Sequence, residues 1–515
     1  MNPHQNTRED LASPQDLIPR LTRFFSARQD PAYLVGGYLR DRLLSHAGAP
    51  YHDGDLDLAV VGDSESIARQ LAAALDASFV PVNPSRGVFR VTSRVPSATG
   101  KPAMPRKWSV DLKGFYGDIR DDLAQRDFTI DAMALSLDDN LAAELTGASW
   151  DGPVIDPFNG RQDLAGKRIR AVSPNVFQED PGRLLRSVRL AAQLGFRLDP
   201  DTATLIRRDA HLVGQTPGER LRDEFLTILS LDGARGHLEV LDRLDLLCRL
   251  IPELAPAKGV EQPLVHYWDV WGHTMHCVEE AEMVVKGHRN SPVYMFVPWT
   301  PDSQIHFSQE VGDGHTRATM LKLAALFHDI AKPQTKSVEA DGRTRFFGHS
   351  ELGAAMAADR LTQLRISARP AALIAKMVKH HLRPNNMSKE VELPTPRAVH
   401  RYFRDLGDAA IDTVYLALAD YLATNGPAVS LEHWSSHARM MGHILQSAAQ
   451  QPVPTGQDRL LNGHDLIEHL GVAPGPLVGE LLEKIIEAQS TGEIHTREEA
   501  LALAQESLPN RRRRE

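Results

Sequence analysis

Two aspartates in the segment HDGDLDLAVV, residues 52–61, are spaced for metal chemistry. Asp55 and Asp57 are one residue apart at the start of an apolar run typical of a strand, so their side chains share one face. Neighbouring anions repel unless a cation lies between them, and hard ions such as Mg²⁺ prefer oxygen ligands. Asp111, in the predicted strand WSVDL, is a candidate third carboxylate. Such a site activates a hydroxyl and neutralises a leaving pyrophosphate, whereas the alternative is a hydrated turn.

A double glycine precedes this segment, where residues 34–41 read LVGGYLRD. Gly36 and Gly37 between a strand and a helix let the backbone approach a ligand closely, and a helix N terminus favours phosphate. Such turns also end strands in many unrelated folds, so this element alone does not specify a nucleotide site.

One aspartate and three arginines are regularly spaced in EDPGRLLRSVR, residues 179–189. This stripe along one predicted helix consists of Asp180, Arg183, Arg186 and Arg189. The alternative is a solvated helix face held by surface ion pairs.

A His-Asp pair lies inside the apolar segment LAALFHDIAK, residues 323–332. Burying a carboxylate without a partner is costly, so His328 and Asp329 indicate a set of interacting polar groups. Imidazole and carboxylate together suit Mn²⁺, Fe²⁺, Ni²⁺ or Zn²⁺ better than Ca²⁺.

The elements that must position these residues change in type along the chain. Apolar residues at helical spacing predict a helix over residues 14–28. The following β-type runs alternate with helical segments such as 64–75, and they cover residues 32–37, 56–61, 88–94, 107–112 and 128–137. After the turn DPFNG at 156–160, β signals nearly vanish and periodic helices follow.

The expected fold class is therefore α+β, an α/β first domain followed by all-α domains. Residues 252–264 and 452–456 gather proline and glycine and predict boundaries, and 287–318 is expected to be a surface loop or insertion. The predicted domains cover residues 1–155, 156–255, 256–450 and 451–515.

Composition places the chain among ordinary cytoplasmic proteins. Its 515 residues include 42% hydrophobic and 24% charged residues and only two cysteines, Cys248 and Cys277, which suit a reducing compartment. No secretory signal and no membrane-spanning run are predicted, so no membrane partner is expected. A net charge of −9 excludes a protein that coats nucleic acid indiscriminately. The run Arg511–Arg514 is a candidate RNA contact, and the alternative is a solvated tail.

Three motifs resemble one known family. Residues 35–45 read VGGYLRDRLLS, residues 125–134 read QRDFTIDAMA and residues 156–164 read DPFNGRQDL. In this order and spacing they resemble the VGGxVRDxLLG, RRDFTINAMA and DPxxGxxDL elements of polymerase-β-type nucleotidyltransferases. More narrowly, they resemble the bacterial-type (class II) CCA-adding tRNA nucleotidyltransferases and bacterial poly(A) polymerases. The helix at 179–196 matches the family's EDPxRxLRxxRFAAxxGF element.

This resemblance covers roughly residues 30–250 and implies a polymerase-β-like head, then a helical neck that holds RNA by shape and backbone. It implies that Asp55 and Asp57 hold Mg²⁺ and that Asp111 orients or activates the RNA hydroxyl. The residues expected at the nucleotide phosphates are Gly36, Gly37, Arg40, Arg126, Arg186 and Arg189.

In that family Asp180 and Arg183 replace a template. A carboxylate only accepts hydrogen bonds and a guanidinium only donates them. Cytosine and adenine each present an amino donor beside a ring-nitrogen acceptor, which suits this pair. Uracil and guanine reverse the pattern, so we expect C and A to be accepted and U and G rejected.

The later histidines and aspartates resemble the HD superfamily of metal-dependent phosphohydrolases over roughly residues 265–425. The resemblance implies metal ligands His273, His328, Asp329 and Asp420, with His349 and His380 in additional positions. The alternative is an HD fold that serves only as a scaffold. By analogy, an active domain would trim phosphate or 2′,3′-cyclic phosphate from damaged RNA ends.

Three departures from the family pattern bear on activity. Gln125 stands where an arginine is usual, so one phosphate contact is expected to be missing, and Asp131 stands where asparagine is usual. After Asp111, residues 112–118 lead directly into the next helical segment. Many CCA-adding relatives have a longer basic loop there that helps them switch from C to A. Complete CCA addition, CC-only addition, A-only addition and poly(A) synthesis are therefore all open.

The leading hypothesis is transfer of CMP or AMP from CTP or ATP to an RNA 3′ hydroxyl, most plausibly of tRNA, with release of pyrophosphate. A second hypothesis makes the HD phosphohydrolase the main activity and the first domain a nucleotide sensor. A third is a non-catalytic RNA-binding protein. Replacing Asp55 and Asp57 separates them, because only the first hypothesis loses its activity. The oligomeric state is not predicted.

Overall fold

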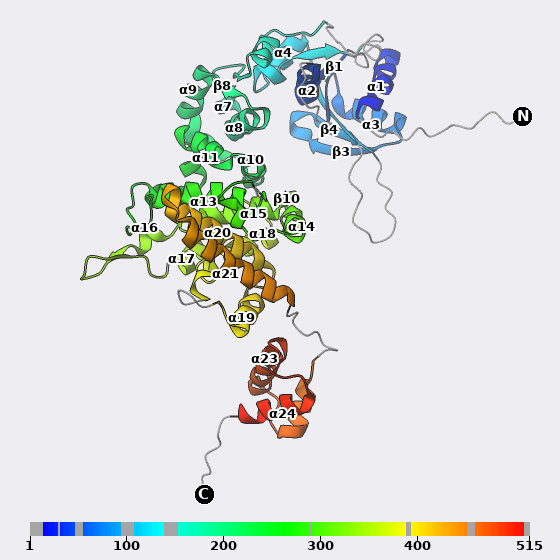
Figure 1. Cartoon of the computed structure of the whole chain (residues 1–515). Helices are drawn as coiled ribbons and strands as arrows, with labels where there is room; N and C mark the ends of the chain where they lie inside the picture. The colour runs from blue at the N-terminus through cyan, green and yellow to red at the C-terminus, as the bar shows by residue number, and fades with distance from the viewer. Residues whose placement is uncertain are drawn as a thin grey trace, which may run out of the picture. The chain divides into compact units, whose positions relative to one another are not determined.

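The computed structural model describes residues 14–28, 31–46, 55–93, 108–137, 153–287, 290–387, 393–450 and 459–508. It divides into two compact units, Met1–Thr216 and Pro217–Glu515. The first unit combines a sheet with helices, and the second is almost entirely helical (Figure 1). Among the described residues, no helix is both long enough and apolar enough to cross a membrane.

The first unit is built on a six-stranded sheet with the order β3-β4-β5-β2-β1-β6. Its central strands β2 and β5 are parallel, and every other neighbouring pair is antiparallel. The strands are β1 (Ala32–Val35), β2 (Leu56–Val61), β3 (Ser78–Asn83), β4 (Val88–Thr92), β5 (Ser109–Phe115) and β6 (Ala134–Ser136).

Side-chain alternation along β2 explains how the sheet is covered. Leu58 and Val60 are buried on one face, and Ala59 is buried on the other. The face that holds Ala59 packs with Ile119 and Leu123 of α4 (Ile119–Ala124). Asp57 is two residues from Ala59 and shares its face, so the sheet turns this carboxylate towards the same side as α4.

Further helices and two short strands complete the first unit. The helices that pack on the sheet are α2 (Gly36–His46) and α3 (Ser64–Ala74). We call the sheet with α2, α3 and α4 the head. The remaining elements are α1 (Pro14–Arg28), η1 (Pro84–Arg86), η2 (Thr129–Asp131), α6 (Gly160–Ala165), β7 (Arg168–Ile169), α7 (Val176–Glu179), α8 (Arg183–Leu194), β8 (Arg197–Leu198), α9 (Pro200–Asp209) and η3 (Ala210–Gln215).

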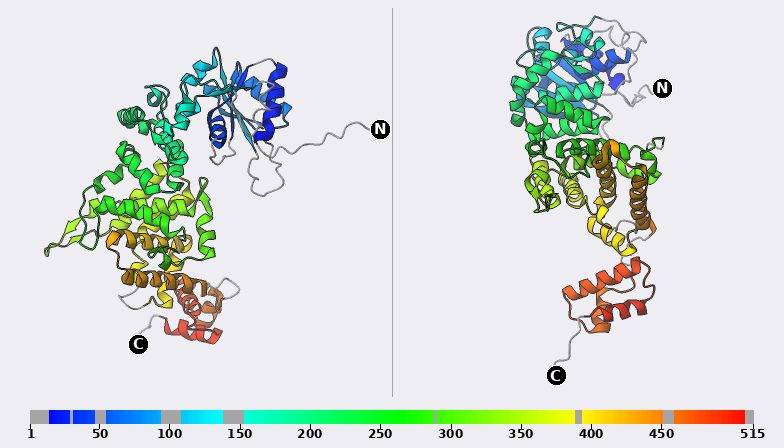
Figure 2. Two further views of the ribbon diagram at one scale, coloured as in Figure 1. Left: turned by 45° about the horizontal axis from the view of Figure 1, so that its top comes forward. Right: turned by 60° about the vertical axis from the view of Figure 1, so that its left-hand side comes forward.

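The second unit centres on α13 (Val270–Val284), α15 (Arg317–Phe327) and α20 (Ala410–Asn425). Helix α20 packs against α13, α15 and α21 (Leu431–Gln450), and α17 (His349–Gln363) packs against α18 (Ala368–His380). Figure 2 shows these long helices side by side in both views. Their facing residues are fully buried, which makes this the main core of the unit.

Shorter elements surround this core. The helices are α10 (Gly218–Ser230), α11 (Ala234–Arg243), α12 (Leu247–Leu250), α14 (Pro301–Ser308), α16 (Lys332–Thr335) and α19 (Pro396–Leu406). The short strands are β9 (Glu310–Gly312), β10 (His315–Thr316), β11 (Ser337–Val338) and β12 (Thr344–Arg345). The 3₁₀ turns are η4 (Pro252–Ala257), η5 (Tyr294–Phe296), η6 (Asn385–Met387), η7 (Gly407–Ala409) and η8 (Gly426–Ala428).

A small cluster follows near the end of the chain. Helices α22 (Gly463–Leu470), α23 (Pro476–Ser490) and α24 (Arg497–Glu506) pack around their own core, which includes Leu466, Leu481 and Ile485. The basic run Arg511–Arg514 lies outside the described residues.

The α+β class is confirmed, and the differences are local. Strand β3 was not expected, because its sequence SFVPVN contains a proline. The stretch 287–318 is not only a loop, since it contains α14, whose Phe307 is buried. Thr300 and Ser303 form a capping box at the start of that helix, with Pro301 in its first turn, and this signal was readable in the sequence.

Candidate active site and metal centre

The head carboxylates meet at one end of the central strands. The parallel pairing of β2 and β5 sets Asp57 beside Asp111, and β1 places Val35 on the other side of Asp57. Asp55, which directly precedes β2, is more exposed than either. Parallel pairing of the two strands therefore brings together residues more than fifty positions apart.

Gly36 leaves space for the Asp57 carboxylate. Its φ is +70°, a left-handed conformation that favours glycine, and a Cβ there would lie 2.7 Å from Oδ2 of Asp57. A side chain at position 36 would therefore collide with the carboxylate. The backbone at Gly36 therefore passes close to the carboxylate of Asp57.

Arg90 of β4 balances the charge of these aspartates. Its Nε lies 2.6 Å from Oδ1 of Asp111, and one terminal nitrogen lies 2.7 Å from Oδ2. The same guanidinium lies 3.7 Å from Oδ2 of Asp55. The sequence analysis missed Arg90, because only the sheet register shows that it faces Asp111.

Burial raises the pKa of Asp57 to about 6, with Arg126 opposing the rise and Asp111 adding to it. In the described part of the chain, the sets that bring three possible metal ligands within 4.8 Å of one another both lie in the second unit. The head aspartates form no such set. This group of aspartates suits Mg²⁺, which takes one or two carboxylates and completes its shell with water and substrate phosphate.

The expected phosphate-binding arginines are held by buried acids. Arg126 donates to Oδ2 of Asp122, which also pairs with Lys113. Arg40 is buried, and one terminal nitrogen donates to Oδ1 of Asp131 at 2.9 Å. Arg40 is therefore bonded inside the head rather than presented to solvent.

Asp131, which stands where the family usually has asparagine, now has a physical explanation. Its second oxygen lies 3.8 Å from a guanidinium nitrogen of Arg186. A carboxylate, unlike an amide, gives both Arg40 and Arg186 a negative partner in a buried place.

The predicted base-selecting helix docks on the segment that carries Arg126. Arg183 donates to the backbone carbonyl of Gln125 at 2.7 Å, and Nε of Arg186 donates to Asp127 at 2.6 Å. Arg189 instead bonds Gln193 farther along α8, at 2.7 Å. Arg183 and Arg186 therefore contact the segment that follows α4, whereas the bond between Arg189 and Gln193 stays within the region of α8.

Asp180 lies just before α8, at the end of α7. It is buried, and its Oδ1 accepts a hydrogen bond from the backbone of Gly182. Arg86 of η1 lies 3.5 Å from its Oδ2. The carboxylate predicted to select the base therefore lies beside an arginine that the sequence did not single out.

The second site is a buried group of histidines and aspartates in the second unit. His273 comes from α13, His328 and Asp329 follow α15, and Asp420 comes from α20. Nε2 of His273 lies 3.2 Å from Asp329 Oδ2 and 3.1 Å from Asp420 Oδ1. Nε2 of His328 lies 3.1 Å from Asp329 Oδ2. These four side chains are the principal ligands that the HD resemblance implies.

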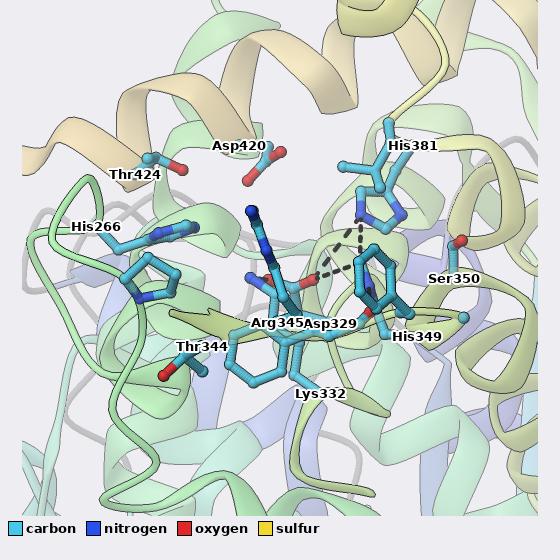
Figure 3. A pocket seen from close by; sticks show the side chains of 15 residues that line it. His266, Asp329, Lys332, Thr344, Arg345, His349, Ser350, His381, Asp420 and Thr424 are labelled. Carbon is cyan, nitrogen blue, oxygen red and sulfur yellow. Dashed lines mark hydrogen bonds and ion pairs between the residues drawn. The ribbon is translucent and has the colours of Figure 1, made fainter. Parts of the chain in front are cut away.

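The additional histidines are His349 and His381. Nε2 of His349 lies 3.4 Å from Oδ1 of Asp329, and Nε2 of His381 lies 3.8 Å from the same oxygen (Figure 3). His380, the histidine expected here, ends α18, is partly exposed, and belongs to neither of the ligand sets. The structure therefore corrects the expectation by one residue, because the buried phase of α18 (Ile374, Met377, Val378) continues to His381.

The protonation of this cluster follows from burial and neighbouring charge. Burial alone would raise the pKa of Asp329, but His328 and Lys332 outweigh it and hold that pKa well below its usual value. Burial lowers the pKa of His381 to about 4, with His328 contributing. Burial alone would lower the pKa of His328, but Asp329 outweighs it and holds that pKa well above its usual value. Metal ligation requires an ionised carboxylate and a neutral imidazole, so an ion bound here would displace the proton of His328.

A pocket of about 340 Å³ opens onto the cluster. Asp329, His349, His381 and Asp420 line it (Figure 3). Lys332 and Arg345 add two positive charges to the wall. The pocket thus combines metal-ligand chemistry with a basic lining that suits an anion.

Four family models match consecutive parts of the sequence. "Poly A polymerase head domain" matches residues 32–170, and "Probable RNA and SrmB- binding site of polymerase A" matches 195–258. "HD domain" matches 306–425, and "tRNA nucleotidyltransferase domain 2 putative" matches 426–504. Together they follow the order predicted from the motifs.

Whole-chain similarity decides the family. The A-adding tRNA nucleotidyltransferase of Deinococcus radiodurans is 31% identical over 482 residues, covering 92% of this chain and 95% of the relative. The chain belongs to the tRNA nucleotidyltransferase family. The CC-adding tRNA nucleotidyltransferase of Thermus thermophilus is 30% identical, with 92% of each chain covered. A solved CCA-adding enzyme in complex with ATP has the same fold, with a TM-score of 0.63, 19% identity, and 97% and 96% of the two chains covered.

Within this family of RNA-modifying enzymes, the connection after β5 is short here. β5 ends at Phe115 and α4 begins at Ile119, so Tyr116, Gly117 and Asp118 make the whole connection. Asp118 caps α4 through the backbone of Arg120, which leaves little free chain for a loop.

Replacing Asp131 tests its role as the shared anion of Arg40 and Arg186. Asp131→Ala is expected to destabilise the head by about 3 kcal/mol, because it leaves the buried guanidinium of Arg40 without that anion and removes one of the anions beside Arg186. Asp131→Asn should cost less, since the amide still accepts from Arg40. Hydrogen exchange of η2 and of the start of α2 resolves the head from the rest of the chain. Equal protection in Asp131→Ala and in the exposed control Asp121→Asn would contradict this role.

Proposed function

We propose that this chain transfers CMP or AMP from CTP or ATP to the 3′ end of tRNA, without a template and with release of pyrophosphate. The carrying observation is the pair Asp57 and Asp111 on adjacent parallel strands, with Gly36 leaving room beside Asp57. The 3′ oxygen of the RNA forms a bond to the α-phosphorus while the bond to pyrophosphate breaks. Family membership and a related structure with bound ATP support this reaction.

Each side chain of the head has a separate proposed role in this reaction. Asp55 and Asp57 are the proposed Mg²⁺ ligands, and Asp111 orients the attacking hydroxyl. Bound Mg²⁺ supplies activation of that hydroxyl and neutralises the leaving pyrophosphate. Arg126 provides positive charge near Asp57 for the triphosphate, and Asp122 holds its guanidinium in place.

Base selection is proposed to rest on Asp180 and Arg183. The contacts of Arg183 with Gln125 and of Arg186 with Asp127 attach α8 to the segment that holds Arg126. The residues proposed for the base are therefore joined by direct contacts to those proposed for the phosphates. Such a link lets the fit of the base influence the position of the α-phosphorus.

The short connection after β5 favours C addition over A addition. In the family that the motifs resemble, many CCA-adding members have a longer basic loop at this place, whereas here only three residues are available. We therefore propose that the chain adds C and adds A poorly or not at all. The similarity to both CC-adding and A-adding relatives makes the order of addition the first quantity to measure.

Single-nucleotide incorporation into tRNA checks this proposal. Transcripts that end before CCA, after C and after CC receive one labelled nucleoside triphosphate at a time with Mg²⁺. We expect C on the first two transcripts and little A on the third. Asp57→Asn should reduce incorporation by ~10³-fold, because a transition-state charge loses its partner. The exposed Asp201→Asn is the matched control. Long A tails on unrelated RNA, or no incorporation at all, would overturn the proposal.

Nucleotide choice is expected to fail when Asp180 or Arg183 is replaced. In Arg183→Ala the preference for C over U should fall by roughly 10²-fold, because a mispaired donor no longer opposes uracil. The exposed Arg197→Ala is the matched control, because Arg197 is not among the residues expected at the nucleotide. Competition between labelled CTP and UTP measures the ratio. Unchanged selectivity in both Arg183→Ala and Asp180→Ala would rule out this pair as the selector.

A second function is favoured by the HD cluster, which we propose is a metal-dependent phosphohydrolase using Mn²⁺, Fe²⁺, Ni²⁺ or Zn²⁺. Four imidazole and carboxylate side chains converge in the interior, and a basic pocket reaches them. That chemistry fits phosphate or 2′,3′-cyclic phosphate at RNA ends.

Paired substitutions separate the two activities. Asp55→Asn with Asp57→Asn should abolish incorporation and leave hydrolysis of 3′-phosphorylated or 2′,3′-cyclic RNA ends unchanged. His328→Ala or Asp329→Ala should do the reverse. Phosphate release and ring opening are measured on the same oligonucleotides. If hydrolysis is absent with every metal in the series, the HD domain is a scaffold. If incorporation survives loss of both head aspartates, the head is a sensor.

A further inference from the structure

Arg86 connects the turn between β3 and β4 to the carboxylate that is proposed to select the base. Nη1 of Arg86 lies 3.5 Å from Oδ2 of Asp180, and Oδ1 of Asp180 accepts a hydrogen bond from the backbone of Gly182 at 3.1 Å. Asp180 is buried, whereas the side chain of Arg86 is 62% exposed. The two contacts fall on different oxygens, so together they restrict rotation of the carboxylate.

The turn that carries Arg86 has a defined shape. Oδ1 of Asn83 accepts from the backbone N–H of Arg86 at 3.2 Å and from the hydroxyl of Ser85 at 2.8 Å. Pro84 begins η1, and Gly87 ends it with a φ of +65°, a left-handed conformation that favours glycine. These features fix the backbone at Arg86, so its side chain extends from a constant position.

The turn is also packed against the rest of the head. The carbonyl of Gly87 accepts from the hydroxyl of Ser64 at 2.8 Å and from the backbone of Gly114 at 3.3 Å. A Cβ on Gly114 would lie 2.7 Å from the carbonyl of Gly62, so a side chain there would collide with the backbone. Because β5 and α3 both contact the turn, the guanidinium extends from the packed body of the head.

The second residue proposed to select the base has a negative partner of its own. Nη1 of Arg183 lies 3.5 Å from Oε2 of Glu179, and its guanidinium also donates to the carbonyls of Val176 and Gln125. We call Asp180 and Arg183 the base selector. Each member of the base selector therefore has an opposite charge that is supplied from outside the pair.

These outside partners matter because the two members of the base selector carry opposite charges. A carboxylate and a guanidinium that come close form a strong pair, and a base would have to break that pair before it could bind. Outside partners leave both groups oriented in advance, which lowers the cost of binding. An arginine that balances Asp180 therefore affects how well the base is selected, even without contacting the base.

We propose that Arg86 is a positioning residue of the base selector, and that it holds the carboxylate of Asp180 towards the base and away from Arg183. This role rests on the nucleotide addition and the base selector proposed above. It adds a third residue, from the turn between β3 and β4, to a choice that the sequence motif assigns to residues 180–183. The strands of the head then contribute to base selection as well as to catalysis.

Competition between labelled CTP and UTP, on tRNA that ends before CCA, tests this role in the full chain. Arg86→Ala should lower the preference for C over U by roughly 5-fold, the upper range for an ion pair with one exposed partner. Arg86→Lys should restore most of the preference, because its ammonium keeps a positive charge beside Asp180. Arg69→Ala is the matched control, since Arg69 is an exposed arginine of the head that pairs with Glu65.

A double-substitution cycle separates positioning from a structural effect. If Arg86 acts through Asp180, Arg86→Ala should cause no further loss of preference in a chain that already carries Asp180→Ala. A structural effect would instead lower kcat/KM for CTP and UTP alike in both backgrounds, and this result would overturn the role of Arg86.

The remaining outcomes distinguish this role from the proposals on which it rests. An unchanged preference in Arg86→Ala, while Asp180→Ala loses it, overturns the role of Arg86 and leaves the base selector standing. An unchanged preference in Asp180→Ala overturns the base selector and the role of Arg86 together. A parent chain that incorporates no nucleotide overturns the proposed reaction itself.

Discussion

Compensation of buried carboxylates is the constraint on which this structure depends. Asp122, Asp131, Asp163, Asp329 and Asp412 are all at least 96% buried and ion-paired. Three of them draw a cation from another element, since Asp122 pairs with Lys113 of β5, Asp131 with Arg40 of α2 and Asp412 with Arg317 of α15. These three ion pairs therefore link separate elements. Removing one partner of such a pair costs about 3–5 kcal/mol, more than most single apolar contacts contribute. The same pairs that join the elements also hold Arg40 and Arg126 in place.

The two sites differ in the residues that compensate their neighbouring carboxylates. In the head, arginines supply the positive charge around the aspartates. Arginine does not lose its proton, so it leaves the carboxylates ionised for a hard cation. In the HD cluster, imidazoles surround the carboxylates, and transition metals prefer such nitrogen donors. The choice of arginine or histidine as the neighbour is therefore consistent with the different metals proposed for the two sites.

Much of this arrangement could be predicted from the sequence. The Asp-x-Asp spacing, the apolar runs around it and the glycine turn identified the head strands and their carboxylates, because these signals are local. Arg90 and Arg86 could not be found in this way, since their relation to Asp111 and Asp180 depends on sheet register and loop position. Asp131 was noticed as a departure, but its meaning needed the positions of Arg40 and Arg186. The helical phase of Met377 and Val378 favours His381 over His380 as the buried histidine of α18, so the sequence alone indicates which of the two lies beside Asp329.

The two proposed sites lie in different compact units of the chain, so substitutions can change one without changing the other. No proposed ligand of the HD cluster belongs to Met1–Thr216, and no proposed head ligand belongs to Pro217–Glu515. The histidines of the HD cluster can therefore be lost in one lineage and kept in another while the residues of the head stay the same. The presence of an intact histidine set in a descendant sequence then records a retained use for it rather than a by-product of keeping the head folded.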